Sequence, residues 1–392
     1  MVRSLGNPRS VRTVTQERRI RAALGAARFL DCDLVVRMPP MHPTGHAALQ
    51  LDLTVDGDLI IDCDPRVGLM HRSAEKLFEA RDYRQVLMLA SRHDWLGSFS
   101  GEHGAALVIE EALGIVPPER ARWSRTLLAE LSRASAALAF LSPVSQERSD
   151  ESCSTLRLRE SLVQHLERAT GNRVHPMITR IGGIGAPLRD VWISETAAIV
   201  RGLRESLSRL ADEFPHSTAS LAGLGVLDGD LARELGASGP VGRASGVDLD
   251  ARRIAAYDAY PECVDLLRPA PRLAGDAQAR YAALADDALV ALDIVDRCSA
   301  VLSELGDMPI DVPLPKVVRV PEGQTYRVVE TPLGMTGFWL MSIGDRSPWR
   351  LKLRTPSFSH VQAMANALRG VPLSALPTVI ASFFIVVGDI DR

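Results

Sequence analysis

Residues 41–95 read MHPTGHAALQLDLTVDGDLIIDCDPRVGLMHRSAEKLFEARDYRQVLMLASRHDW, and this stretch decides the fold. Apolar and polar side chains alternate over residues 48–62 on both sides of Asp56-Gly57, which is typical of two antiparallel strands joined by a tight turn. From Leu69 the apolar spacing becomes helical, with one densely charged side. We therefore expect a hairpin and a polar helix to face one cleft, with the histidine loop 42–46 at the rim of the hairpin.

The residues before this stretch predict one helix and one strand. A short helix is expected near residues 17–29, in a basic segment, and a strand at 34–36. The strand leads into Pro39-Pro40, which fixes the backbone just before the histidine loop.

The middle of the chain has mainly helical periodicity. In residues 120–141 apolar side chains recur every three or four positions, which predicts a helix packed in the core. The glycines of 181–187 lack the Lys-Ser/Thr tail of a phosphate-binding loop, so nucleotide binding is not expected there. Helices are predicted at 101–113, 120–141, 156–169, 200–211 and 281–305, and loops at 181–187 and 242–246.

After Pro309 the pattern changes to short strands separated by Gly and Pro. Strands are predicted at 317–320, 326–330, 337–341 and 349–354, followed by a helix at 360–368. The sequence thus predicts an α+β protein in three parts. These are an N-terminal segment with a small β-sheet (1–68), a mainly helical bundle (69–308) and a mixed β/α C-terminal unit (309–392).

Composition limits the classes of partner and site. The 392 residues carry a formal net charge of -3 and are 46% hydrophobic, which gives no reason to expect nucleic acid or an acidic membrane surface as a partner. The five cysteines are widely spaced and form no C-x-x-C, so neither a disulfide framework nor a metal site held by this chain alone is expected. A reducing, cytosolic setting fits this pattern.

Two segments of the sequence are relevant to export and to membrane insertion. Arginines interrupt the apolar residues near the beginning of the sequence, so no signal peptide is expected. Residues 371–388 form an uncharged run just long enough to span a membrane. Pro372 and Pro377 would break its first turns, and acidic residues follow it directly. A buried core helix is therefore favoured over a transmembrane one.

Seven strings carry a resemblance to the D subunit of proton-pumping NADH-quinone oxidoreductase, in the order seen in that family. They are HPTGHAALQL, DPRVGLMHRSAEKLFEARDYRQ, ALGIVPPERARWSRTLLAELSR, TGNRVHPMITRIGG, GRASGV, SPWRLKLRTPSF and VVGDIDR. That family is related to the large subunit of nickel-iron hydrogenases, so the resemblance implies a hydrogenase-like fold. A nickel-iron centre needs paired cysteines near both ends of the chain. This sequence has none, so hydrogenase activity is not expected.

The resemblance implies a role in electron transfer within a translocase. The chain would bind no cofactor or metal itself. It would form a quinone-reduction pocket with an iron-sulfur subunit that holds a tetranuclear cluster, while NAD(H) is used elsewhere in the complex. The assembly would lie at the cytoplasmic side of the cell membrane, and this chain would associate with the membrane peripherally, through its partner subunits.

Three residues are expected on the quinone side. His46 matches the family histidine that hydrogen-bonds the quinone head group, and imidazole suits proton donation near neutral pH; a purely structural histidine is the alternative. Trp95 stands where the family has a tyrosine, and an indole N–H donates a hydrogen bond but no phenolic proton. His93 is a candidate substitute for that donor. Glu147 matches a family carboxylate, with a solvated loop as the alternative.

Three more residues are expected on the side of the electron donor. Arg72 and Arg92 match arginines that lie beside the partner's iron-sulfur cluster in the family. His175 matches the histidine whose protonation is linked to reduction of that cluster. Positive or protonatable groups beside a reduced cluster stabilise the added electron. Solvated arginines on helices are the alternative interpretation.

The departures from the family pattern support a second hypothesis. Trp95 stands in place of a tyrosine of the family, Glu147 in place of a shorter carboxylate, and Phe384 in place of an aspartate. For Phe384 we expect only a packing role. The chain would then be a non-catalytic scaffold subunit of a divergent complex-I-like or hydrogenase-related assembly. The retained histidine and the cluster-facing residues favour activity instead.

Overall fold

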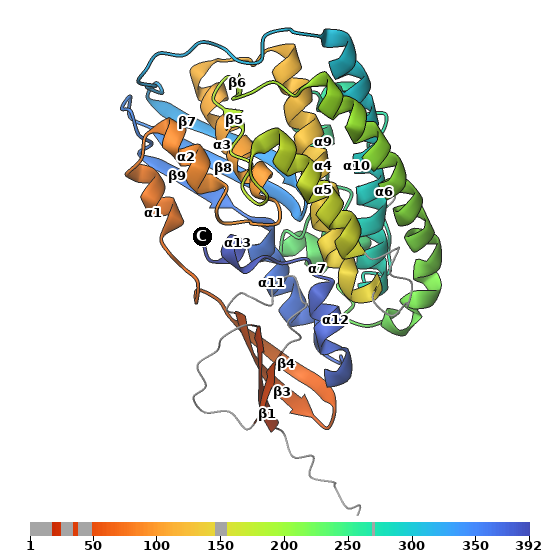
Figure 1. The fold of residues 1–392 in the computed structure, drawn as a ribbon. Helices are drawn as coiled ribbons and strands as arrows, with labels where there is room; N and C mark the ends of the chain where they lie inside the picture. Colours follow the sequence, from red (N-terminus) through yellow and green to blue (C-terminus); the bar gives the residue numbers. More distant parts are fainter. Residues whose placement is uncertain (1–17, 25–33, 38–48, 146–154, 269–270) are drawn as a thin grey trace, which may run out of the picture.

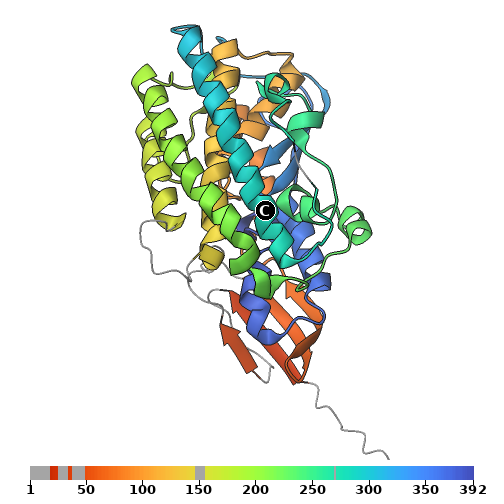
Figure 2. The ribbon, with the colours of Figure 1, turned by 90° about the vertical axis from the view of Figure 1, so that its right-hand side faces the viewer.

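The computed structural model describes residues 18–24, 34–37, 49–145, 155–268 and 271–392. A small sheet lies at one end of the molecule, and at the other end long helices lie beside a second sheet (Figure 1). Viewed from the side, the long helices run next to one another along one flank of the molecule (Figure 2). The chain is therefore a mixed α and β structure with small sheets, as the sequence predicts.

The N-terminal sheet contains the predicted hairpin, which is confirmed. Its strands are β1 (Arg18–Leu24), β2 (Leu34–Arg37), β3 (Leu49–Asp56) and β4 (Leu59–Arg66), in the order β2-β1-β3-β4. Gly57 turns the chain between β3 and β4 with a φ of 62°, a conformation that glycine adopts without strain.

The prediction of a helix near residues 17–29 is wrong for residues 18–24, the part of this range that the structure describes. Residues 18–24 form β1, which is antiparallel to β3 and parallel to β2. Ile20 pairs with Leu53, and both side chains are buried. Pairing with two neighbouring strands thus decides the conformation of this segment over its local pattern. The strand predicted at 34–36 is confirmed as β2.

The helices of the middle region lie where the spacing predicts them, and most are longer. α3 ends at Gly114, whose φ of 66° supplies the left-handed residue that commonly ends a helix. α4 buries Leu127, Leu131 and Leu138 along its length. The elements are α1 (Ala74–Glu79), α2 (Tyr83–Ala90), α3 (Ser98–Leu113), α4 (Glu119–Ser145), α5 (Thr155–Thr170), α6 (Asp190–Ser217) and α10 (Ala277–Leu305).

Two segments predicted as loops contain regular structure. Residues 181–187 contain the turn and the second strand of a tight hairpin between β5 (Thr179–Arg180) and β6 (Gly183–Ile184). Residues 242–246 overlap the end of α8 (Gly239–Ala244), so a loop there is only partly right. The remaining short elements are η2 (Ala219–Leu221), α7 (Gly229–Glu234), α9 (Ala251–Ile254) and η3 (Tyr260–Cys263).

The C-terminal sheet has the order β7-β8-β9, with all pairs antiparallel. Its strands are β7 (Gly323–Thr331), β8 (Gly334–Ser342) and β9 (Arg350–Arg354), and α11 (Pro356–Ala367) follows. Residues 317–320 form no strand, so that prediction is wrong. The sheet packs on α3 so closely that a Cβ at Gly104 would lie 2.1 Å from Cε2 of Phe338.

The uncharged run 371–388 is largely buried, as predicted, but it is not one helix. It contains η4 (Leu373–Ala375), α12 (Leu376–Ala381), a buried stretch at 383–386 and the start of α13 (Val387–Ile390). Phe384 interrupts the run with a φ of 48° and packs edge-on against Phe140 and Tyr281. Within the described ranges, no helix is both long and apolar enough to cross a membrane.

Residues 370–373 extend the N-terminal sheet. The amide of Gly370 donates to Ile60 O at 2.7 Å, and the amide of Ile60 donates to Val371 O at 3.0 Å. These bonds attach the C-terminal part of the chain to β4. The division of the chain at residues 68 and 308 stays a prediction.

Candidate functional site

The C-terminal hollow is a cavity of about 200 Å³. It lies near α13 and the segment that joins β4 to α1, whose backbones are drawn in Figure 1. Its walls come from three parts of the chain: residues 70–77, the residues Leu89, Arg92 and His93 at and after the end of α2, and residues 388–392. The apolar lining includes Met70, Ala74, Leu77 and Leu89; the polar lining includes Arg72, Arg92, His93, Asp391 and Arg392.

Asp391 fixes the C-terminal wall of the hollow. Its two carboxylate oxygens accept hydrogen bonds from the amides of Gly68 at 2.6 Å and Met70 at 2.8 Å. Arg392 donates from Nε to Leu353 O at 2.8 Å, which holds the next residue against β9. Both oxygens of Asp391 are therefore already occupied by backbone donors.

His93 pairs with Asp389 on the inner side of the hollow. Its Nδ1 lies 3.1 Å from Oδ1 of Asp389, and the His93 side chain is 5% exposed. The other carboxylate oxygen of Asp389 accepts from the amide of Ser357 at 3.2 Å. Nε2 of His93 is buried and has no partner within the described part of the chain. The bond at Nδ1 sets the ring orientation and leaves Nε2 as the free nitrogen.

Asp94 follows His93 and begins the turn into α3. Its Oδ1 accepts hydrogen bonds from the amides of Leu96 at 3.1 Å and Gly97 at 2.9 Å. Burial, and then the negative charge of Asp389, raise the pKa of Asp94 to about 7. Two acidic groups therefore lie close to the imidazole of His93.

Of the three residues expected on the donor side, Arg92 lies near both Arg72 and His175. Arg72 and Arg92 line the C-terminal hollow, and Arg92 donates from Nη2 to Sδ of Met177 at 3.2 Å. Burial, followed by the positive charge of Arg92, lowers the pKa of His175. Nδ1 of His175 is buried without a partner among the described residues. Arg92 thus lies between the hollow and His175.

Trp95 faces a different depression. It lines a narrow crevice together with Ser132, Ser135 and Arg159, between α4, α5 and the start of α3. Its ring lies against Gly388, where a Cβ would come within 2.4 Å of Cζ3 of Trp95. The chain therefore turns from the hollow at His93 to the crevice at Trp95 within two residues.

His46 and Glu147, the two residues predicted to be catalytic, lie outside the described residues. The same holds for His42. The hairpin that follows His46 and the helix that ends two residues before Glu147 are described, so the neighbouring elements have known positions. The roles of both residues remain predictions.

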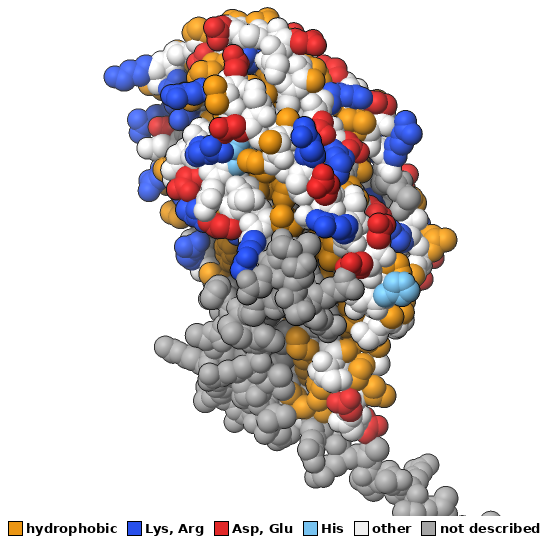
Figure 3. Space-filling view, turned by 45° about the vertical axis from the view of Figure 1, so that its right-hand side comes forward, with side chains coloured by type: hydrophobic (Ala, Val, Ile, Leu, Met, Phe, Trp, Pro, Cys, Tyr) orange, Lys and Arg blue, Asp and Glu red, His pale blue; other side chains and the backbone are white. Residues whose placement is uncertain are grey.

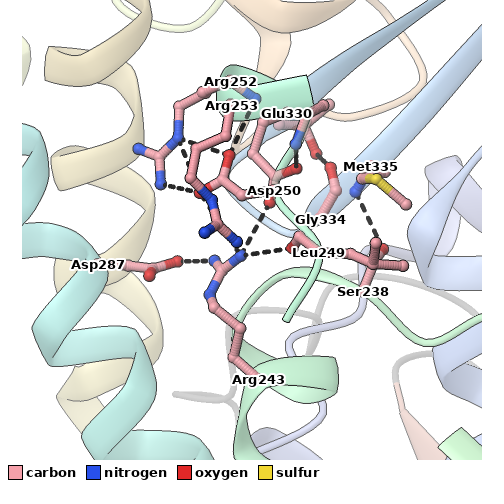
Figure 4. Close-up of polar contacts among 12 residues, drawn as sticks. Ser238, Arg243, Leu249, Asp250, Arg252, Arg253, Asp287, Glu330, Gly334 and Met335 are labelled. Atoms are coloured by element: carbon pink, nitrogen blue, oxygen red, sulfur yellow. Dashed lines mark hydrogen bonds and ion pairs between the residues drawn. The ribbon is translucent and has the colours of Figure 1, made fainter. Parts of the chain in front are cut away.

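A buried ionic network is a feature that the sequence reasoning missed (Figure 4). Arg243, from α8, contacts Asp287 and lies 3.3 Å from Oε1 of Glu330. Arg252 binds Asp250 through two nitrogens, at 3.0 and 2.7 Å. The string GRASGV contains Arg243, but no local pattern indicates that its partners come from α10 and β7.

The pKa values of two carboxyl groups in this network are shifted in opposite directions. Burial and the charge of Asp250 raise the pKa of Glu330 to about 7. Although burial favours the neutral acid, Arg252 holds the pKa of Asp250 below its usual value. The network ties α8, α9, α10 and β7 together, which is a structural role.

A larger cavity, of about 740 Å³, opens between α2 and residues 177–185 and 310–314. Glu102 lines this cavity and accepts hydrogen bonds from the amides of Ile178 at 3.1 Å and Thr179 at 3.0 Å. Met177, which contacts Arg92, also lines it. Across the described ranges, no three His, Cys, Asp or Glu side chains are grouped so that they could hold a metal ion.

Comparison with known proteins decides the family. A family model described as "Respiratory-chain NADH dehydrogenase, 49 Kd subunit" matches residues 151–317 and 312–392. The D 2 subunit of NADH-quinone oxidoreductase from Salinispora tropica is 43% identical over 368 residues, which covers 93% of this chain and 94% of the relative. The chain belongs to the family of NADH-quinone oxidoreductase D subunits.

Other relatives are also named as D subunits of NADH-quinone oxidoreductase. The D 1 subunit from Streptomyces coelicolor is 42% identical over 373 residues, with 94% of this chain and 97% of the relative covered. The D subunit from Protochlamydia amoebophila is 30% identical over 384 residues, with 91% and 95% covered. As a member of the D-subunit family, the chain is a subunit of an oxidoreductase complex. The resemblance drawn from the seven strings is confirmed.

Proposed function

We propose that this D-subunit family member forms one wall of a quinone-reduction pocket, and that an iron-sulfur partner subunit forms the other. The observation that carries the proposal is the position of Arg92, which lines the C-terminal hollow with Arg72 and lies close enough to His175 to lower its pKa. Two positive charges and an imidazole on one face suit a neighbouring centre that gains negative charge on reduction. The partner's tetranuclear cluster would supply the electrons.

Reduction of a quinone to a quinol takes two electrons and two protons. The partner supplies the electrons, so this chain contributes hydrogen bonds and protons. We propose His46 as the imidazole that donates to the quinone head group, with Glu147 as its carboxylate and Trp95 as an N–H donor in the place of a phenol. NAD(H) is used elsewhere in the complex, and this chain binds no cofactor of its own.

We further propose that the assembly lies at the cytoplasmic side of the cell membrane, with this chain held there peripherally by its partners. A fold like that of the large subunit of nickel-iron hydrogenases, divided into 1–68, 69–308 and 309–392, belongs to the same proposal. The mixed architecture and the family membership support it. An experimental structure of the assembled complex would test the fold, the division and the location together.

A scaffold role is the second candidate function. It is favoured by Phe384, which is fully buried between Phe140 and Tyr281 and offers no polar group. Trp95 likewise packs against Gly388. A scaffold subunit would retain the partner contacts but contribute no proton to the acceptor.

Replacement of His46 separates the two functions. In the purified complex, His46→Ala should lower the rate of quinone reduction at least tenfold, because general acid catalysis contributes about 10²-fold or more. The matched control is His216→Ala, at the exposed end of α6. Both variants must retain the partner subunits. An unchanged rate for His46→Ala in an intact complex would establish the scaffold function.

A further inference from the structure

Two buried thiols that the proposed function does not use lie next to each other. Cys263 is the last residue of η3, and Cys298 lies in α10. Both are free cysteines with buried side chains, and the thiol of Cys298 donates a hydrogen bond to the sulfur of Cys263. Among the described residues, the third free cysteine is Cys63, which is buried in β4. The chain thus contains a pair of reduced sulfurs in contact and a buried cysteine for comparison.

Arg297 holds the two cysteine segments together. It precedes Cys298 on α10, and its Nη1 donates to the carbonyl oxygen of Glu262 at 3.0 Å. Its guanidinium group also binds both carboxylate oxygens of Asp265, with Nη2 2.9 Å from Oδ2. Glu262 and Asp265 lie on either side of Cys263 in the sequence. These contacts therefore fix η3 against α10 at the place where the two thiols meet.

The two thiols differ in reactivity. The hydrogen bond from Cys298 lowers the pKa of Cys263 although burial opposes it, and the positive charge of Arg297 acts in the same direction as the bond. Burial, and then the bond to Cys263, raise the pKa of Cys298. The nucleophile in cysteine oxidation is the thiolate. Cys263 is therefore suited to attack an oxidant, and Cys298 is placed as the resolving thiol.

Cys263 lies just below the surface of the molecule. Val264, which follows it, is 51% exposed, and the side chain of Glu262, which precedes it, is 42% exposed. η3 is a single short turn of four residues. A segment of this kind opens locally at a lower free energy than the whole chain. A molecule as small as hydrogen peroxide can thus reach the sulfur of Cys263.

We propose that Cys263 and Cys298 are a redox-modification site at which hydrogen peroxide forms a reversible disulfide. The Cys263 thiolate attacks one peroxide oxygen, the O–O bond breaks, and the departing hydroxide takes up a proton to leave as water. The Cys298 sulfur then attacks the resulting sulfenic acid, and the hydroxyl group leaves with the Cys298 proton as a second water. Two electrons pass from the sulfurs to the peroxide. Small thiols reverse the bond, as expected of a redox-sensing disulfide in a reducing compartment.

The disulfide would join η3 to α10 beside the buried ionic network. Tyr260, at the other end of η3, donates to Oε1 of Glu130 at 2.6 Å, and Oε2 of Glu130 accepts from Arg252 at 3.1 Å. A covalent bond at Cys263 would therefore restrain the turn that closes this end of the network. The modification would form whether or not the chain reduces quinone, so it is independent of the proposed function.

Peptide mapping of the purified complex tests for the disulfide. Trypsin places the two cysteines in separate peptides, 254–272 and 298–316. After exposure to hydrogen peroxide and alkylation of the remaining thiols, we expect these two peptides to be linked, and dithiothreitol to separate them. Cys63 is the matched control, because burial raises the pKa of its thiol to about 12. It should be recovered as an alkylated free thiol.

Single variants test the order of attack. In Cys298→Ser the sulfenic acid of Cys263 has no resolving thiol, so dimedone should trap it about tenfold more than in the native chain. In Cys263→Ser, Cys298 should stay reduced at the same peroxide dose. Cys63→Ser should leave the linkage between the two peptides unchanged. All three variants must retain the partner subunits.

Conversion of Met308, which is 43% exposed, to its sulfoxide sets the peroxide dose. Recovery of Cys263 and Cys298 as free thiols at that dose overturns the inference. Equal dimedone labelling of Cys263 and Cys63 in Cys298→Ser overturns it too. The effect of His46→Ala is measured separately in the reduced complex. Loss of quinone reduction in His46→Ala without any disulfide leaves the proposed function intact, and a disulfide with unchanged quinone reduction in His46→Ala leaves only this inference standing.

Discussion

Nδ1 of His93 lies 3.1 Å from Oδ1 of Asp389, although 296 positions separate the two residues. Asp389→Ala removes this bond and also the acceptor for the amide of Ser357. Nδ1 of His93 and the amide of Ser357 would then be buried without this partner. We expect a loss of about 2–4 kcal/mol in the free energy of unfolding, measured by urea denaturation. The control Asp307→Ala, at an exposed position, should change it by less than about 0.5 kcal/mol. Equal losses in both variants would contradict a structural role of the pair.

Asp94 makes stability depend on pH. Burial and Asp389 raise its pKa to about 7, from a usual value of 3.8, so between about pH 4 and 7 the native state binds a proton that the unfolded state releases. The native state therefore loses stability as pH rises through this range. Asp94→Asn cannot ionise, yet its Oδ1 can still accept the amides of Leu96 and Gly97.

The free energy of unfolding of Asp94→Asn, relative to that of the native protein, should consequently increase by about 1–4 kcal/mol as pH rises from 5 to 8. Unfolding free energies at the two pH values measure this gain. For the control Asp307→Asn, the difference in unfolding free energy from the native protein should be the same at pH 5 and pH 8. An Asp94→Asn difference that does not change with pH would mean that Asp94 ionises normally.

Gly388 allows close packing between α13 and the segment 93–95. A Cβ there would lie 2.3 Å from the carbonyl oxygen of His93 and 2.4 Å from Cζ3 of Trp95. We expect Gly388→Ala to destabilise the chain by about 1–3 kcal/mol or more and to change the fluorescence of Trp95. Gly202→Ala, in α6 and with open space around its Cα, should stabilise it by about 0.5–1 kcal/mol. Similar melting temperatures for the two variants would refute this packing.

Arg243 holds the buried ionic network together. Arg243→Leu leaves the buried carboxylates of Asp287 and Glu330 without this guanidinium group. We expect a loss of about 3–5 kcal/mol in the free energy of unfolding, because removal of one partner leaves buried charge uncompensated. Arg209→Leu on the exposed face of α6 is the control. That face carries interspersed positive and negative side chains (Figure 3), where single charges contribute little.

The sequence predicted the local elements well and the long-range contacts poorly. The hairpin at 49–66 and the helix ending at Gly114 follow from signals a few residues long. β1 was predicted as a helix because its pairing with β3 and β2 is not visible locally. The run 371–388 was expected to be one helix, but Phe384 and the bonds of residues 370–373 to β4 divide it.

The candidate site illustrates the same limit. Arg72, Arg92 and His175 were singled out from the resemblance, and the structure places Arg72 and Arg92 on one hollow with His175 next to Arg92. The His93–Asp389 pair and the bonds of Asp391 to Gly68 and Met70 join residues about 300 positions apart, so no spacing rule could indicate them. His46 and Glu147 lie outside the described residues, and their roles stay predictions.

The bonds of residues 370–373 to β4, and of Asp391 to Gly68 and Met70, also bear on how the protein is made. During synthesis, β4 and the segment after it leave the ribosome about 300 residues before their partners exist. Contacts this distant in sequence slow folding. Until the last residues emerge, the edge of β4 and the amides of Gly68 and Met70 lack these partners, so the nascent chain presents an unpaired strand edge that is open to aggregation.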